Sequence, residues 1–93
     1  MSKTPDRIVK KFYADWCAPC KVFTPKLEQV AEEFDAGIIN VNIEEHPEEA
    51  RAMNVRSIPS IFFYEGDELK GYRMSVGSTT IHNLRTTFEE MYG

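Results

Sequence analysis

The sequence contains few cysteines, no long hydrophobic run and no excess of positive charge. Lysine and arginine number 11 against 15 aspartates and glutamates, which gives a formal net charge of -4. A chain without a basic surface is a poor partner for nucleic acid or for an anionic membrane. No apolar stretch approaches the roughly 20 residues that cross a bilayer, and residues 1–11 contain no signal-peptide core. We therefore expect a cytoplasmic protein that binds neither nucleic acid nor membrane.

Both cysteines lie in one motif, Trp-Cys-Ala-Pro-Cys, at residues 16–20. Two thiols at this spacing can share one disulfide and exchange it with another protein. A structural staple that closes so short a loop would add little stability and is rare in a reducing cytosol. Zinc usually needs four ligands, and the two histidines, His46 and His82, lie far from the motif. The sequence favours a redox-active pair, with no metal and no cofactor besides the Cys17–Cys20 disulfide.

The hydrophobic spacing after the motif places Cys17 at the start of a helix. Apolar residues recur every three or four positions until about residues 35–37, which predicts one buried helix face: Val22, Phe23, Leu27, Val30, Ala31 and Phe34. Unpaired N–H groups and the positive end of the dipole at a first helical turn stabilise a thiolate. Pro19 is tolerated in that turn. We assign Cys17 as the nucleophile and Cys20 as the thiol that resolves the mixed disulfide.

The remaining pattern predicts alternating strands and helices in a single domain of residues 1–93. Strands are expected at residues 7–14, 38–43, 61–64 and 72–76, with a turn at 65–67 between the last two. A short helix is expected at 47–53, and Ser78 is expected to cap a final helix with Ile81, Leu84, Phe88 and Met91 on its apolar face. The order βαβαββα predicts an α/β fold, with a four-stranded mixed sheet flanked by helices.

The chain resembles the thioredoxin family at four separated places. They are residues 12–21 (Phe-Tyr-Ala-Asp-Trp-Cys-Ala-Pro-Cys-Lys), Pro25, residues 55–60 (Val-Arg-Ser-Ile-Pro-Ser), and the pair Val76 and Gly77. They occur in the order and at the spacing typical of the family, and the similarity runs from about Arg7 to the end of the chain. The resemblance implies a thioredoxin-like minimal fold and a redox role for the cysteine pair.

The sequence departs from the family pattern in two ways. Thioredoxins usually have a strand and a helix before the strand that leads to the motif, so this chain resembles a short form. Lys11 stands where the family usually buries an aspartate beneath the cysteines, and Asn40 replaces the lysine usual on the neighbouring strand. The carboxylate often credited with deprotonating the second cysteine is therefore missing.

The resemblance also implies a substrate surface around the cysteines. The Ile58–Pro59 peptide is expected to be cis and to face them, although only about 5–6% of X–Pro bonds in folded proteins are cis. The backbone of Ile58 would then pair with a substrate strand, next to a shallow apolar patch. The patch is expected to comprise Trp16, Ala18, Pro19, Ile58, Val76 and Gly77. For Trp16 the alternative is ordinary packing in the core.

Lys11 has three interpretations. Side chains alternate along the strand at 7–14, so Val9, Lys11 and Tyr13 share one face, and Ile8, Lys10 and Phe12 share the other. Lys11 can bury its stem and extend its amine to the surface. Alternatively, its ammonium lies near the cysteines and stabilises a thiolate, or a neutral Lys11 accepts the proton of Cys20.

The resemblance implies a protein-disulfide reductase. Its electrons would come from thioredoxin reductase or an equivalent donor, and its substrates would be disulfide-containing proteins such as ribonucleotide reductase. One alternative is a glutaredoxin-like protein coupled to glutathione, which the short N-terminus favours and the Trp-Cys-Ala-Pro-Cys motif opposes. The other is a binding subunit of a larger assembly, whose redox chemistry is incidental.

Overall fold

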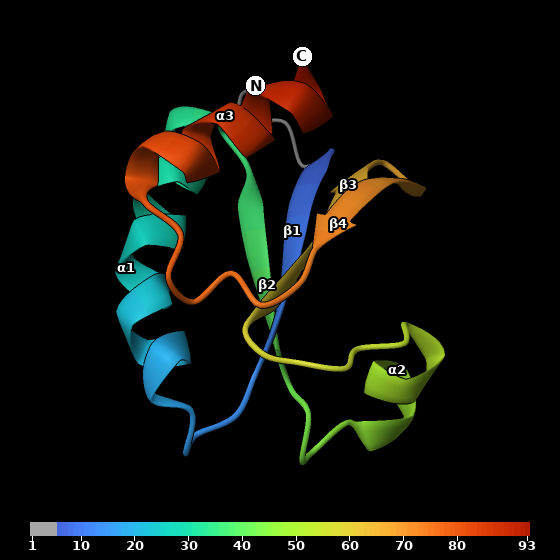
Figure 1. Ribbon diagram of the computed structural model, residues 1–93. Helices are drawn as coiled ribbons and strands as arrows, with labels where there is room; N and C mark the ends of the chain where they lie inside the picture. Colours follow the sequence, from blue (N-terminus) through green and yellow to red (C-terminus); the bar gives the residue numbers. More distant parts are fainter. Residues whose placement is uncertain (1–5) are drawn as a thin grey trace.

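The computed structural model describes residues 6–93, which form a mixed sheet covered by helices on both faces (Figure 1). The elements in chain order are β1 (Arg7–Tyr13), α1 (Ala18–Glu33), β2 (Gly37–Asn42), α2 (Pro47–Ala52), β3 (Ser60–Glu65), β4 (Glu68–Arg73) and α3 (Ile81–Tyr92). The strand order is β2-β1-β3-β4. β1 runs parallel to β2 and antiparallel to β3, and β4 closes the sheet antiparallel to β3. The predicted element order and fold class are confirmed.

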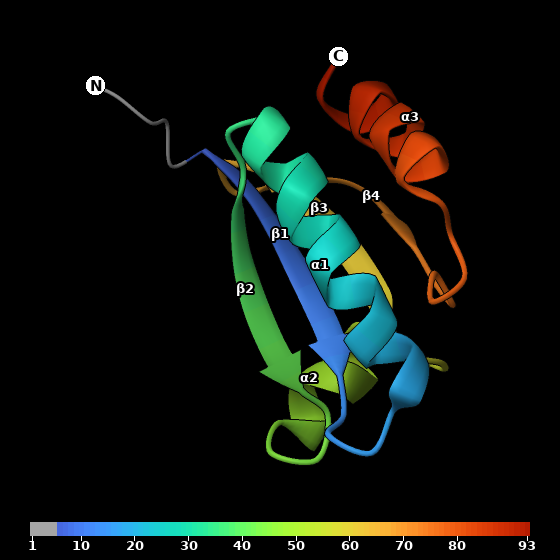
Figure 2. The same cartoon turned by 90° about the vertical axis from the view of Figure 1, so that its left-hand side faces the viewer.

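The helices divide between the two faces of the sheet. α1 and α3 cover one face, and the short α2 lies against the other (Figures 1 and 2). The larger core cluster lies under α1 and α3 and includes Val9, Phe23, Phe63 and Phe88. A smaller cluster around Phe12 and its neighbours fills the space toward α2. Within residues 6–93, none of the helices is long and apolar enough to span a membrane.

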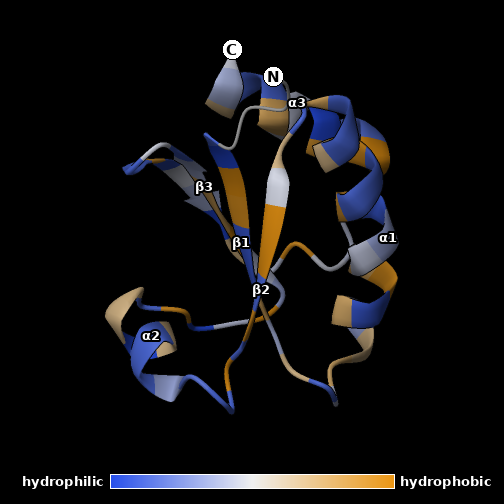
Figure 3. Cartoon of the chain, turned by 180° about the vertical axis from the view of Figure 1, so that it is seen from behind, coloured by the Kyte–Doolittle hydropathy of each residue, from blue (hydrophilic) through white to orange (hydrophobic). Residues whose placement is uncertain are grey.

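β1 is the central strand, and its side chains alternate between the two clusters. Val9 packs under α1, whereas Phe12 contacts the ring of Phe62 on the opposite face, with ring centroids 5.3 Å apart. The two neighbouring lysines follow the same alternation: Lys10 pairs with Glu49 of α2 at 2.6 Å, and Lys11 bonds to a residue of α1. Figure 3 shows the resulting hydropathy pattern, with apolar residues along β1 and β2 and in bands on α1. The predicted division of β1 into two faces is therefore correct.

The predicted last strand, residues 72–76, is wrong in its position. β4 spans Glu68–Arg73, because Gly66 adopts a positive φ of 61° and lets Glu65 pair directly with Glu68 across a tight turn. β4 is an exposed edge strand and needs little apolar content. Val76 lies beyond it in a loop, after Ser75 at a φ of 55°.

Two further predictions about the helices are wrong. Thr80, not Ser78, caps α3, because its hydroxyl accepts a hydrogen bond from the N–H of Asn83 at 3.0 Å. Val22 is 57% exposed, so it does not belong to the buried face of α1. The buried positions of α1 are Cys20, Phe23, Leu27, Val30 and Ala31, and the 3.6-residue period turns Val22 away from them. The other predicted boundaries agree with the structure within one to four residues.

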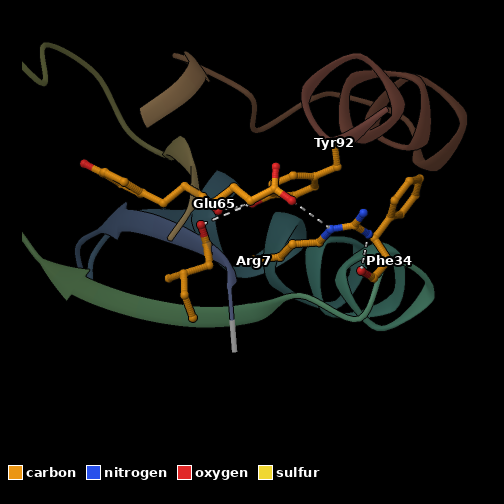
Figure 4. A network of polar contacts seen from close by, with 6 residues as sticks. Arg7, Phe34, Glu65 and Tyr92 are labelled. Atoms are coloured by element: carbon orange, nitrogen blue, oxygen red, sulfur yellow. Dashed lines mark hydrogen bonds and ion pairs between the residues drawn. The ribbon is translucent and has the colours of Figure 1, made fainter. Parts of the chain in front are cut away.

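A polar network closes the end of the sheet opposite the cysteines (Figure 4). The Tyr92 hydroxyl lies 2.9 Å from the carbonyl oxygen of Tyr64, to which it donates, and its ring lies under the Arg7 guanidinium at 5.1 Å. Arg7 also donates to the carbonyl oxygen of Phe34 at 3.0 Å and lies 4.0 Å from the carboxylate of Glu65. The last residue of α3 is thereby tied to two strands and to the end of α1.

This network predicts a change of stability at high pH. Burial raises the pKa of Tyr92 from 10.0 to about 12. The folded state therefore favours the neutral phenol, and this contribution to the free energy of unfolding is lost as the pH rises from 10 through 12. At pH 7, Tyr92→Phe should lower the free energy of unfolding by about 1 kcal/mol through the lost hydrogen bond. The difference between the two proteins should shrink above pH 10, as measured by urea unfolding.

The matched control is Tyr72→Phe, since Tyr72 is 51% exposed on β4. This variant should follow the wild-type pH dependence. A difference between Tyr92→Phe and the wild type that stays constant from pH 7 to 12 would contradict the prediction.

Candidate functional site

Cys17 and Cys20 form a disulfide at the N-terminus of α1, with their Cα atoms 5.3 Å apart. Cys17 is the N-cap residue: its backbone is extended, and its Sγ accepts a hydrogen bond from the N–H of Cys20 at 3.2 Å. Its carbonyl oxygen accepts from the N–H groups of Cys20 and Lys21 at 3.1 and 3.3 Å. Pro19 lies in the first turn, where a proline removes no intrahelical hydrogen bond. The sequence-predicted position of the pair at a helix start is correct.

This position determines which sulfur is suited to be the nucleophile. When the disulfide is reduced, a thiolate on Cys17 faces a backbone N–H donor and the positive end of the α1 dipole. Cys20 lies inside the helix, one turn deeper; both cysteines are buried, Cys17 at 4% and Cys20 at 2% exposure, so the helix position and not burial distinguishes them. The two cysteines pack against Ala14, Tyr13, Ile43 and Ile58. The geometry suits Cys17 for attack and Cys20 for resolution.

A loop with a cis peptide bond lies beside the disulfide. The Ile58–Pro59 peptide is cis, as the family resemblance implies, and Ile58 packs against the cysteine cluster. The N–H of Val76 donates to the carbonyl oxygen of Pro59 at 3.0 Å. A Cβ atom added at Gly77 would lie 2.7 Å from Pro19 Cβ and 3.3 Å from Pro59 Cδ. A glycine at this position therefore allows the loop after β4 to close onto both prolines.

These segments enclose an open apolar groove of about 640 Å³ next to the disulfide. Four residues of the predicted patch line it: Ala18, Pro19, Ile58 and Gly77. Its remaining lining consists of Val22, Lys26, Pro59, Ser75 and Ser78. The groove brings the helix start, the cis-proline loop and the loop after β4 into one surface.

Two residues of the predicted patch lie outside the groove. Trp16 is 65% exposed, so it does not pack in the core, and its indole N–H donates to the carboxylate of Glu44 at 2.7 Å. The side chain of Val76 packs against the core under α1 and α3. The backbone N–H of Val76 connects the loop after β4 to the cis-proline loop.

Val22 and Lys26 are groove residues that the sequence reasoning missed. They follow Ala18 at intervals of four, so the three residues share one stripe of α1. Lys26 also donates to the carbonyl oxygen of Thr79 at 3.0 Å, which ties α1 to the loop before α3. The four-residue spacing is present in the sequence, but the apolar character of Val22 predicts a position on the buried face.

Lys11 lies on the other side of Cys20. It is 6% exposed, and its Nζ donates to the hydroxyl oxygen of Thr24 at 2.7 Å, so the amine does not extend into bulk solvent. The Thr24 hydroxyl in turn donates to the carbonyl oxygen of Cys20 at 2.9 Å. Burial lowers the pKa of Lys11, and the carboxylate of Glu28 acts in the opposite direction. Asn40 is the cross-strand neighbour of Lys11 on β2.

The two histidines lie at the starts of the other two helices. His46 precedes α2, and His82 lies in the first turn of α3. Within residues 6–93, no group of three or more histidine, cysteine, aspartate and glutamate side chains is arranged to hold a metal ion.

A cysteine pair at a helix N-terminus, facing a cis-proline loop on a mixed sheet, is the site of the thiol–disulfide oxidoreductase class. The family model described as Thioredoxin matches residues 1–90. The chain therefore belongs to the thioredoxin family.

Curated relatives and solved structures agree with this assignment. Thioredoxin 1 of Chlorobaculum tepidum is 39% identical over 63% of this chain and 60% of its own length. The thioredoxin of Mycoplasma genitalium is 39% identical over 62% of this chain and 58% of its own. The matches thus span about 60% of the length of these relatives. A mutant thioredoxin from Halobacterium salinarum superposes with a TM-score of 0.83 at 27% identity, covering 96% of this chain and 77% of its own.

The contact between Trp16 and Glu44 yields a spectroscopic prediction. Trp16 is the only tryptophan of the chain, so tryptophan fluorescence reports the surroundings of this one side chain, which include its contact with Glu44. In Glu44→Ala the indole loses its acceptor, and acrylamide should quench its fluorescence more strongly. Because the contact is exposed, the free energy of unfolding should change by less than about 0.5 kcal/mol. Glu45→Ala, one residue further along, is the control and should leave the quenching unchanged. Equal quenching in all three proteins would contradict the contact.

Proposed function

We propose that the protein reduces disulfide bonds of other proteins through a dithiol–disulfide cycle of Cys17 and Cys20. The thiolate of Cys17 attacks one sulfur of the substrate disulfide, releases the other as a thiolate, and forms a mixed disulfide. The thiolate of Cys20 then attacks Cys17 Sγ and releases the second substrate thiolate. Two electrons pass from the dithiol to the substrate, and the Cys17–Cys20 disulfide remains. The observation that carries this proposal is the hydrogen bond from the Cys20 N–H to Cys17 Sγ.

The apolar groove supports a protein substrate over a small thiol. It extends from the helix start to the cis-proline loop, and its volume of about 640 Å³ is large enough for side chains of an extended segment. We place the backbone of Ile58 next to the bound segment, in the role that the family resemblance implies. Trp16 is exposed beside Cys17 and would cover the substrate on its other side.

The donor and the substrates are proposed from the family. Thioredoxin reductase or an equivalent enzyme would return the disulfide to the dithiol, and enzymes such as ribonucleotide reductase, which form a disulfide in each turnover, would be substrates. The cycle needs no cofactor besides the cysteine pair. We propose the cytoplasm as its location, because a reducing compartment keeps such a donor supplied.

Insulin reduction tests the proposal directly. The wild type should reduce insulin with NADPH and thioredoxin reductase, and only slowly with glutathione and glutathione reductase. Cys17→Ser should abolish the activity, and Cys20→Ser should accumulate a mixed disulfide between Cys17 and the substrate. Faster turnover with glutathione would support the glutaredoxin-like alternative. Full cellular function of the double Cys17→Ser, Cys20→Ser variant would support a binding subunit instead.

A substitution at Gly77 tests whether the loop after β4 helps to position a protein substrate in the groove. In Gly77→Ala the added methyl group meets Pro19 and Pro59, which cannot swing aside as a flexible side chain can, so the loop after β4 must move. Reduction of insulin should slow by roughly tenfold, on the scale that small displacements at a site produce. Reduction of the small disulfide reagent DTNB should change by less than about twofold, because that reagent does not need the groove. Stopped-flow and insulin turbidity assays measure both rates.

The control is Gly37→Ala, since its added methyl group meets the flexible end of Ile8 at 3.1 Å, away from the cysteines. This variant should retain both rates. Equal losses toward insulin and DTNB in Gly77→Ala would show that the loop does not act through the groove.

A further inference from the structure

A second pocket lies on the side of Cys20 that faces β1 and β2. It has a volume of about 280 Å³ and is lined by Lys11, Tyr13, Ala14, Asp15, Cys20, Lys21, Thr24 and Asn40. Cys20 lines this pocket and is not part of the lining of the apolar groove. A water molecule occupies about 30 Å³ of the liquid, so the pocket has room for several. The disulfide therefore lies between two different openings. The apolar groove suits a segment of chain, and the pocket at Cys20 is lined mainly by polar residues and has room for water.

Lys11 is held in this pocket by a short chain of hydrogen bonds that ends at the backbone carbonyl oxygen of Cys20. Its Nζ donates to the Thr24 hydroxyl at 2.7 Å, and that hydroxyl donates to the Cys20 carbonyl oxygen at 2.9 Å. Thr24 lies one turn after Cys20 on α1, so both residues face β1 from the same side of the helix. The Nζ also lies 5.3 Å from the centre of the Tyr13 ring. These contacts leave the amine few other positions.

The charged side chains around Lys11 come from α1 and from the residues next to the cysteine motif. Glu28 of α1 interacts with its amine, and Asp15 and Lys21 flank the pocket on either side of the cysteine motif. The β2 neighbour, Asn40, and the β3 neighbour, Ile61, are uncharged. Lys11 is the charged side chain buried deepest in the pocket, because it is 6% exposed.

We propose that Lys11 is a positioning residue whose ammonium stabilises the thiolate of Cys20 and so speeds the resolving step. The inference rests on the proposed function, because it concerns the second half of that cycle. A positive charge held in the same pocket as a thiol favours the ionised form of that thiol. The chain thereby has a cation where a general base would otherwise be needed.

The step balances without a base on the protein. The Cys20 thiol loses its proton to water in the polar pocket, and the resulting thiolate attacks Cys17 Sγ of the mixed disulfide. The Cys17–Cys20 bond forms as the bond between Cys17 and the substrate breaks. The departing substrate thiolate takes a proton from solvent, and Lys11 stays protonated throughout.

The reaction of the reduced protein with DTNB separates the two half-steps. Attack by Cys17 releases one thionitrobenzoate anion, and attack by Cys20 on the mixed disulfide releases a second. At high reagent concentration the second, concentration-independent phase reports Cys20. In Lys11→Met this phase should slow on the order of tenfold at pH 7, and its pH midpoint should rise by about one unit. The first phase should change less, since the N-cap hydrogen bond of Cys17 is intact.

Lys11→Arg retains the positive charge and should restore most of the rate of the second phase. Lys11→Gln provides a second neutral variant if Lys11→Met does not fold, as judged by circular dichroism. Lys10→Met is the matched control, because it removes a positive charge from the adjacent position on the opposite face of β1. It should leave both phases unchanged.

Two results would overturn the inference. A second phase with the wild-type rate and pH midpoint in both neutral variants would show that Lys11 does not act on Cys20. A second phase as slow in Lys11→Arg as in Lys11→Met would show that a positive charge at position 11 does not account for the rate. Either result is distinct from failure of the proposed function, which wild-type insulin reduction tests independently.

Discussion

The start of α1 is the constraint on which the rest of the site depends. Cys17 ends the loop after β1 and caps the helix, so the redox sulfur and the helix N-terminus cannot be separated. The helix is fixed in turn by Phe23 and Leu27, which are fully buried against the sheet. The core therefore positions the sulfur atoms. A substitution that weakens packing under α1 would also disturb the geometry of the disulfide at the helix N-terminus.

β1 connects this helix to the opposite layer. Its residues alternate, so Val9 and Lys11 face α1 whereas Lys10 and Phe12 face α2. Two adjacent lysines on a central strand are costly only if neither finds a partner. Each has one, since Lys10 pairs with a carboxylate and Lys11 with a hydroxyl. One face uses its lysine to hold α2, and the other ties its lysine to Thr24 of α1.

Much of this arrangement could be predicted from the sequence because it depends on local patterns. The periodic apolar residues predict α1 and α3, and the cysteine spacing with Pro19 predicts the helix start. The cis peptide at Pro59 came from family resemblance alone, since local preference opposes it. The position of β4 is not predicted correctly, because an exposed edge strand contains few apolar residues. The exposure of Val22 is not predicted either, because the sequence pattern does not distinguish an apolar residue that lines a groove from one in the core. The pocket at Lys11 depends on contacts between β1 and α1 that no local pattern contains.

The disulfide lies between two openings of unlike character, an apolar groove and a polar pocket, which share none of their lining residues. Under the two proposals, the groove would govern substrate choice and the pocket would govern the rate of disulfide closure, through separate sets of side chains. Substitutions in the groove could then accommodate a new protein substrate while the rate at which the reduced substrate is released is preserved. Conversely, substitutions in the pocket could change the rate of disulfide closure without changing which substrates the groove accepts.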